Sequence, residues 1–166
     1  MSTLSEQTAV SPEWIVVDAV AAVEVHVDRS LESLINDSGV SGLPIGATFL
    51  SRYGEDMSRS WDARYEWLSD GFGVKVKGAK FQQDFHAVIE CRNAIVHGSG
   101  NLTKRQRSSF GKFIQLRKQM ESVLNVRVHG TEVSFSVDSA RNALRVASAF
   151  VQCFDSAVHG VTNLDY

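Results

Sequence analysis

The chain has 166 residues, 43% of them hydrophobic, and a formal net charge of −2, a composition that excludes a disordered or fibrous protein. No apolar run approaches the roughly 20 residues that span a bilayer, and the start of the chain has neither a basic stretch nor an apolar one. We therefore expect a cytoplasmic protein without membrane contact, folded as one domain over residues 1–166 with residues 1–11 flexible.

The charges are separated along the chain. Residues 1–70 hold 4 basic and 12 acidic residues, whereas residues 71–120 hold 10 basic and 2 acidic ones. No acidic residue lies between Glu90 and Glu121. A basic window attracts polyanions such as RNA over long distances, but a solvated face that pairs with the acidic first third of the chain has the same composition.

The first predicted element is a long helix over 12–37. Ser11 supplies an N-cap hydroxyl, Pro12 suits the first helical position, and Glu13 lies near the positive end of the helix dipole. Apolar residues then recur at helical spacing up to a polar, glycine-containing stop.

The next part of the chain is expected to be more broken. Glycines and a proline predict a loop over 38–46, followed by a short helical piece near 47–53. A firmer helix is expected over 57–69, closed by Gly71. The glycine-flanked residues 71–78 indicate a loop or at most one edge strand.

The second half returns to strong helical periodicity. Helices are predicted over 80–97, 104–122 and 138–158. Between the last two, residues 124–128 and 132–135 alternate with period 2 around a His-Gly-Thr turn, which is typical of a β-hairpin. The expected fold class is all-α, a bundle of about five helices with one short hairpin before the C-terminal helix.

One segment carries residues suited to chemistry. Arg92-Asn93-Ala94-Ile95-Val96-His97 places an arginine and a histidine five residues apart, near the end of a predicted helix and in the most basic part of the chain. Such a spacing is common by chance. It gains weight here because an apolar triplet separates the pair and a polar residue, Asn93, follows the arginine directly.

These residue types fit RNA cleavage without a metal. Histidine serves as general base or acid near neutral pH, so His97 is the candidate catalytic base or acid. Arg92 is permanently charged and suited to holding the scissile phosphate, and Asn93 shares a helix face with His97 and would position the ring or the substrate. With the 2′-hydroxyl as nucleophile, the products end in 2′,3′-cyclic phosphates.

Helix geometry favours two copies of this segment in one site. Five residues turn a helix by about 140° and advance it by about 7.5 Å, so Arg92 and His97 do not share a face well and a single helix makes a poor site. Two chains around a two-fold axis would place both pairs in one cleft. Simpler interpretations remain open: His97 as a favourable helix C-terminal residue, and Arg92 as a structural partner of Glu90 or Asp84.

The segment resembles the R-φ-x3-H motif of the HEPN superfamily, and the hairpin is reminiscent of its RiboL-PSP-type group. The long first helix, the motif helix in the second half and the basic helix after it agree with this resemblance. The resemblance implies a homodimeric helical bundle, often a metal-independent endoribonuclease of toxin–antitoxin or phage-defence systems. An antitoxin or a nucleotidyltransferase is then an expected partner.

The remaining expectations concern binding. Lys104, Arg105 and Arg107 are candidate contacts to RNA phosphates. Cys91 and Cys153 lie in apolar helical contexts and are interpreted as packing residues. We expect no metal site and no cofactor, because the cysteines and histidines lack zinc-ligand spacing. Two other interpretations stay open: a non-catalytic HEPN module that binds RNA, a nucleotide or a protein, and a helical interaction protein with an acidic partner.

Overall fold

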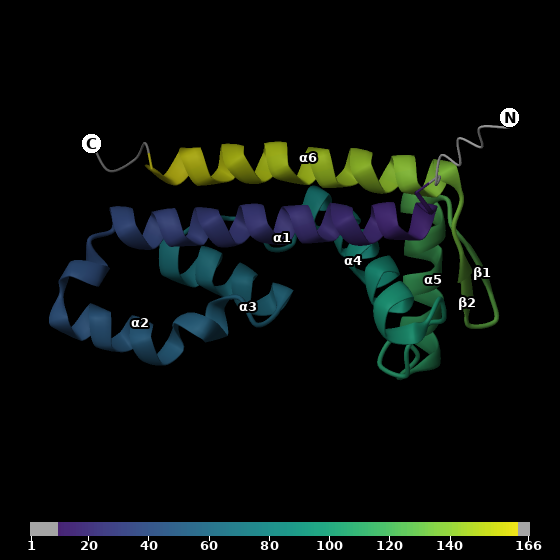
Figure 1. Cartoon of the computed structure of the whole chain (residues 1–166), viewed down its shortest axis with the longest axis horizontal. Helices are drawn as coiled ribbons and strands as arrows, with labels where there is room; N and C mark the ends of the chain where they lie inside the picture. The colour runs from purple at the N-terminus through teal and green to yellow at the C-terminus, as the bar shows by residue number, and fades with distance from the viewer. Residues whose placement is uncertain (1–9, 163–166) are drawn as a thin grey trace, which may run out of the picture. The chain divides into compact units, whose positions relative to one another are not determined.

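The computed structural model describes residues 10–162, apart from the side chains of Tyr53 and Thr162, so the expected flexible segment 1–11 lies almost wholly outside the described residues. Within them, the predicted all-α class with one β-hairpin before the last helix is confirmed (Figure 1). The elements in chain order are α1 (Pro12–Asp37), the 3-10 turn η1 (Val40–Gly42), α2 (Pro44–Met57), α3 (Trp61–Glu66), the π-helical turn η2 (Trp67–Gly71), α4 (Lys80–Gly98), α5 (Phe110–Leu124), β1 (Arg127–His129), β2 (Glu132–Ser134) and α6 (Val137–Thr162).

The chain divides into two compact units. Of the described residues, the first unit contains 10–20 and 87–145, and the second contains 21–86 and 146–162. Helices α1, α4 and α6 therefore contribute residues to both units. Within residues 10–162, no helix is both long and apolar enough to cross a membrane.

Helix α1 has the predicted bounds, and its start shows why. The backbone N–H groups of Trp14 and Ile15 donate to the carbonyl of Ser11 at 3.1 and 3.3 Å, and Ser11 Oγ donates to Glu13 Oε2 at 2.6 Å. Pro12 occupies the first helical position, where no backbone N–H is needed.

In the second unit, aromatic rings of α3, α4 and α6 form one cluster. The ring of Phe150 lies 4.5 Å from that of Phe85 and 5.9 Å from that of Phe154, and the Trp61 ring lies 5.1 Å from Phe85. Aromatic pairs in tilted, edge-on and stacked arrangements stabilise a core by about 0.5–1.5 kcal/mol each beyond area burial. This cluster forms the aromatic centre of the second unit.

Polar pairs tie α1 to two other helices of the second unit. The Arg64 guanidinium of α3 is buried and donates to both carboxylate oxygens of Asp28, at 2.7 and 2.9 Å. His26 Nε2 lies 2.6 Å from Asp155 Oδ1, which places α1 and α6 side by side at this point (Figure 1). A bidentate pair fixes the orientation of both partners.

The expected boundaries between residues 38 and 78 were partly wrong. Helix α2 begins at Pro44, because the proline starts the helix rather than breaking it, and it runs well beyond 47–53. The predicted helix over 57–69 consists of α3 and the turn η2, and it begins later than predicted. Helix α2 ends at Met57, and Ser60 Oγ caps α3 by accepting from the Ala63 N–H at 3.1 Å. Residues 73–78 contain no strand, so the interpretation of the glycine-flanked segment as a loop holds.

In the first unit, the chain after α4 is attached to the hairpin. The hairpin pairs Val128 with Val133, and both side chains are buried. The Leu102 N–H donates to the Thr131 carbonyl, and the Val133 N–H donates to the Gly100 carbonyl, each at 2.8 Å. The segment that follows the motif helix is therefore held in place by backbone hydrogen bonds.

Two further helix boundaries differ from the prediction. Helix α5 begins at Phe110 instead of residue 104, because Ser109 caps it by accepting from the Lys112 N–H at 3.3 Å. Residues 104–109 are consequently a turn and loop. Helix α6 continues to Thr162 rather than ending at 158. The predicted helix over 80–97 is confirmed as α4, with one more residue at its end.

Candidate functional site

The part of α4 in the first unit is apolar on one side and polar on the other. Its buried apolar side chains are those of Ala87, Val88, Ile89, Cys91 and Ala94. Arg92 and Asn93 are half-buried, and His97 in the last turn is exposed. The three polar residues of the motif therefore lie at the surface, where a substrate can reach them.

The two cysteines differ. Burial raises the pKa of the Cys91 thiol far above its usual range, and the neighbouring Glu90 carboxylate adds to the rise. A thiol that stays protonated is a poor nucleophile, so Cys91 is a packing residue as expected. Cys153 is exposed, and its interpretation as a packing residue was wrong.

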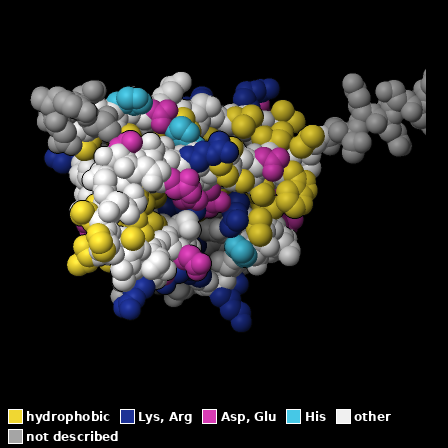
Figure 2. Space-filling model, turned by 60° about the vertical axis from the view of Figure 1, so that its left-hand side comes forward, with side chains coloured by type: hydrophobic (Ala, Val, Ile, Leu, Met, Phe, Trp, Pro, Cys, Tyr) yellow, Lys and Arg dark blue, Asp and Glu magenta, His cyan; other side chains and the backbone are white. Residues whose placement is uncertain are grey.

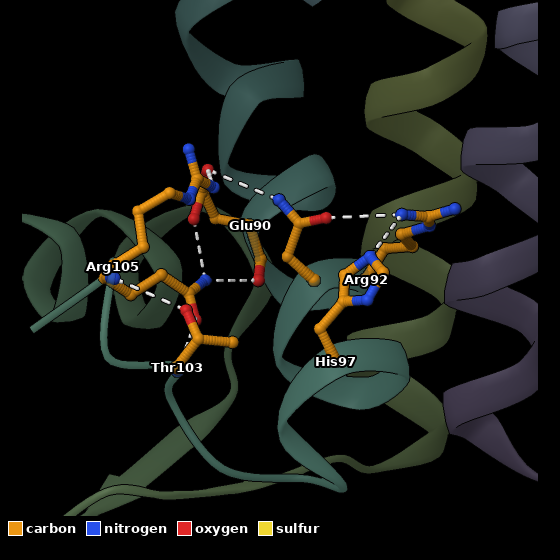
Figure 3. Close-up of polar contacts among 7 residues, drawn as sticks. Glu90, Arg92, His97, Thr103 and Arg105 are labelled. Atoms are coloured by element: carbon orange, nitrogen blue, oxygen red, sulfur yellow. Dashed lines mark hydrogen bonds and ion pairs between the residues drawn. The ribbon is translucent and has the colours of Figure 1, made fainter. Parts of the chain in front are cut away.

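Arg92 and His97 meet in space within a single chain. Arg92 Nη1 lies 3.2 Å from His97 Nε2, as the dashed line between them in Figure 3 marks. The two residues meet although their positions on the helix are about 140° apart. The long arginine side chain reaches along the helix to the histidine ring.

This contact defines the hydrogen-bonding state of the histidine. A guanidinium has only N–H donors, so in this contact His97 Nε2 is the acceptor, which fits the tautomer that carries its proton on Nδ1. A neutral imidazole nitrogen with an available lone pair is the form in which histidine acts as a base. The arginine occupies that lone pair as long as nothing else draws its donors away.

Asn93 supports the arginine. Its Oδ1 accepts from Arg92 Nη1 at 3.3 Å, and its Nδ2 lies 3.5 Å from Glu90 Oε1. The two carboxylates considered as structural partners of Arg92 pair with other cations: Glu90 pairs with Arg105 at 2.8 Å, and Asp84 pairs with Lys80. The described contacts of Asn93 therefore orient the guanidinium.

Glu90 is a site residue that the sequence analysis considered only as a partner for Arg92. Its side chain is buried, with 5% of the residue exposed. Gln106 Nε2 donates to Glu90 Oε2 at 2.6 Å and to the Glu90 backbone carbonyl at 2.8 Å, and Arg105 Nη2 donates to Oε1 at 2.8 Å. A buried carboxylate is tolerated because several donors satisfy it. The sequence did single out Glu90 in one respect, because it is one of only two acidic residues in the basic stretch 71–120.

Gln106 links this carboxylate to the loop. It is 5% exposed, and its Oε1 accepts from the Thr103 N–H at 2.8 Å and from Thr103 Oγ1 at 3.1 Å. We call Glu90, Asn93, Thr103, Arg105 and Gln106 the Glu90 network (Figure 3). The network connects the loop after α4 to Arg92 through Asn93.

The three predicted phosphate contacts all lie on this loop and are exposed. Lys104 forms no hydrogen bond or ion pair within the part of the chain that the structure describes. Arg105 uses one terminal nitrogen for Glu90, and Arg107 Nε donates to the Leu102 carbonyl at 3.0 Å. Lys104 is therefore the least engaged of the three cations.

No group of three or more histidine, cysteine, aspartate or glutamate side chains within residues 10–162 is arranged to hold a metal ion. The fold and site define a helical protein with an Arg–His pair at its surface, supported by a buried carboxylate. The chain matches no protein-family model, no curated protein and no solved structure.

Proposed function

We propose that this protein is a metal-independent endoribonuclease of the HEPN type, acting as a toxin or phage-defence effector. The observation that carries the proposal is the 3.2 Å contact between Arg92 Nη1 and His97 Nε2 at the exposed end of α4. It joins a permanent cation, suited to a phosphate, to an imidazole, suited to proton transfer.

The chemistry follows from these two groups. A phosphate of the RNA draws the Arg92 donors to its oxygens and frees the lone pair on His97 Nε2. The imidazole then removes the proton from the 2′-hydroxyl, and the 2′-oxygen attacks phosphorus. The 5′-oxygen leaves and receives a proton from an acid, which gives a 2′,3′-cyclic phosphate and a 5′-hydroxyl end. Arg92 stabilises the charge that develops on the phosphorane.

A homodimer is part of the proposal. A neutral His97 accepts the proton from the 2′-hydroxyl, but the same ring cannot donate one to the leaving oxygen at the same moment. A second copy supplies a second His97, which gives a proton to the leaving 5′-oxygen when its ring is protonated and its Nε2 no longer accepts from Arg92. Light scattering at micromolar concentration tests this point: we expect the mass of two chains, and a clean monomer contradicts it.

RNA is the proposed partner, held in part by Lys104, Arg105 and Arg107. These side chains are exposed and follow the motif helix directly in the chain. An antitoxin or a nucleotidyltransferase is the proposed regulatory partner, because an unrestrained ribonuclease would damage the cell that makes it.

The test is cleavage of a structureless RNA in EDTA by the wild-type protein, by His97→Ala and by the matched control His129→Ala. His129 is also exposed and followed by glycine, but it lies on the hairpin. We expect His97→Ala to lower the rate by about 10²–10⁴-fold, with RNA affinity kept, and the control to cleave normally. RNA binding without cleavage by the wild type would instead support a non-catalytic module.

A further inference from the structure

Phe110 is an exposed aromatic side chain within the basic window. The surface carries hydrophobic side chains among its charged ones (Figure 2), and two large ones, Phe110 and Ile45, are each 80% exposed. Phe110 is the first residue of α5 and follows directly on the turn and loop 104–109. Single exposed apolar residues are common, so its meaning depends on its surroundings.

Those surroundings are cationic. Lys104, Arg107 and Lys112 are exposed and lie within six residues of Phe110 along the chain. No acidic residue lies between Glu90 and Glu121. Ile45 differs in this respect, because its helix α2 carries Arg52 together with Glu55 and Asp56. An aromatic ring in a stretch of exposed cations matches a polyanion that also has flat apolar groups.

The ring is presented by a well-anchored part of the chain. Ser109 caps α5 immediately before Phe110, and Gln106 fixes the preceding turn to the buried Glu90 carboxylate. A side chain on a preorganised backbone loses less conformational entropy on binding than one on a free loop.

We infer that Phe110 is a stacking platform for an unpaired base of single-stranded RNA, with Lys104 and Lys112 holding the flanking phosphates. The inference rests on the proposed function and defines its substrate as single-stranded. Every base has a π-face that can stack on an aromatic side chain. In a duplex these faces are covered by neighbouring base pairs, so the platform discriminates by strandedness.

The positive charge around Phe110 argues against a second copy of this chain as the partner that binds this surface. Two such surfaces brought together would place Lys104, Arg107 and Lys112 against their own counterparts, with no acidic residue between Glu90 and Glu121 to offset them. An acidic peptide would satisfy the cations and leave the ring without a matching partner.

The experiment measures affinity by fluorescence anisotropy for a short, structureless 2′-O-methyl oligoribonucleotide and for its duplex. The probe lacks the 2′-hydroxyl nucleophile, so it is bound without being cleaved. We expect Phe110→Ala and Phe110→Leu to weaken single-strand binding by roughly 5- to 150-fold, with the duplex unaffected. Phe110→Tyr should retain binding, because it keeps the ring. Ile45→Ala, the control of equal exposure, should bind as the wild type does.

Salt dependence separates the ring from the cations. Lys112→Ala should lower the slope of log affinity against log salt by about 0.7, the value for one phosphate contact on a single strand. Phe110→Ala should leave that slope unchanged, because stacking releases no counterions.

Several outcomes overturn the inference. If Phe110→Ala and Phe110→Leu bind the single strand as tightly as the wild type does, while Lys112→Ala binds less tightly, the RNA surface stands and the platform is wrong. If Phe110→Ala changes the sedimenting mass without changing affinity, the ring is a contact between copies. Contacts between cationic side chains and phosphates are strong at about 50 mM salt. If the wild type binds no RNA under that condition, the proposed function fails together with the inference.

Discussion

Gln106 Nε2 donates to Glu90 twice, at 2.6 Å to the carboxylate and at 2.8 Å to the backbone carbonyl. Both side chains are buried, so the amide compensates for the removal of a charge from water. Arg105 binds the same carboxylate but keeps 72% of its own side chain exposed. The two donors therefore differ in what their loss would cost.

Gln106→Leu should destabilise the fold more than Arg105→Ala. The first change removes hydrogen bonds to a buried charge, an effect of about 1.5–3 kcal/mol. The second breaks an ion pair whose cation is in water, an effect of about 0–1 kcal/mol. Urea unfolding followed by circular dichroism measures both. Equal losses of unfolding free energy would show that the Gln106 amide is not the main group that stabilises the buried Glu90 carboxylate.

Arg92→Lys should impair cleavage although it keeps the positive charge. Lysine lacks the planar fork that contacts Asn93 and His97 and that grips two phosphate oxygens. We expect a rate lower by about 10²-fold, as for the loss of one donor to a transition-state oxyanion. Arg127→Lys on the hairpin, also exposed, is the matched control. Full activity of Arg92→Lys would mean that charge alone suffices.

Lys104→Ala should weaken RNA binding without lowering the rate at saturating RNA. The loss should shrink as the salt concentration rises, because an exposed phosphate contact is screened. Lys80→Ala is a suitable comparison, since Lys80 is also exposed but already pairs with Asp84. A loss of affinity that persists at high salt would indicate a contact other than a phosphate.

The Cys91 thiol predicts a decline of stability at alkaline pH. Its pKa is raised in the folded protein, so above the ordinary value of 9.0 the unfolded state loses a proton that the folded state keeps. The free energy of unfolding should then fall by up to about 1.4 kcal/mol per pH unit. Tyr65, buried with a raised pKa, should add to the decline above 10.0.

Denaturant unfolding across this pH range measures the effect. Cys91→Ala should flatten the slope just above pH 9.0, whatever the variant's absolute stability. Thiol labelling gives an independent reading: the exposed Cys153 should react in the native protein, and Cys91 only after unfolding. Equal labelling of both thiols in the native state would contradict the assigned burial.

Local signals explain which elements could be predicted from the sequence. Helix α1 has Ser11, Pro12 and its apolar period within the same stretch, although the Ser11 hydroxyl donates to Glu13, and α4 ends at a glycine. The start of α5 was missed because residues 104–109 are compatible with a helix on their own. The side chain of Gln106 instead binds Glu90, which lies 16 residues earlier, and no local pattern encodes that contact.

The candidate site was predictable in its residues but not in its geometry. The motif identified Arg92, Asn93 and His97 as candidates. Their contacts depend on side-chain reach, which is why the Arg92–His97 hydrogen bond did not follow from backbone spacing. Glu90 was visible as a rare acid in a basic window, but only the fold shows that its carboxylate is buried.

The chemistry of the product ends tests the central claim most directly. Wild-type protein is incubated with a structureless RNA in EDTA, and the ends are identified by mass spectrometry, with His97→Ala in parallel. We predict 2′,3′-cyclic phosphate and 5′-hydroxyl ends, absent from the variant, because His97 activates the 2′-hydroxyl. Products with 3′-hydroxyl ends, cleavage that requires added Mg²⁺, or full activity of His97→Ala would contradict the account.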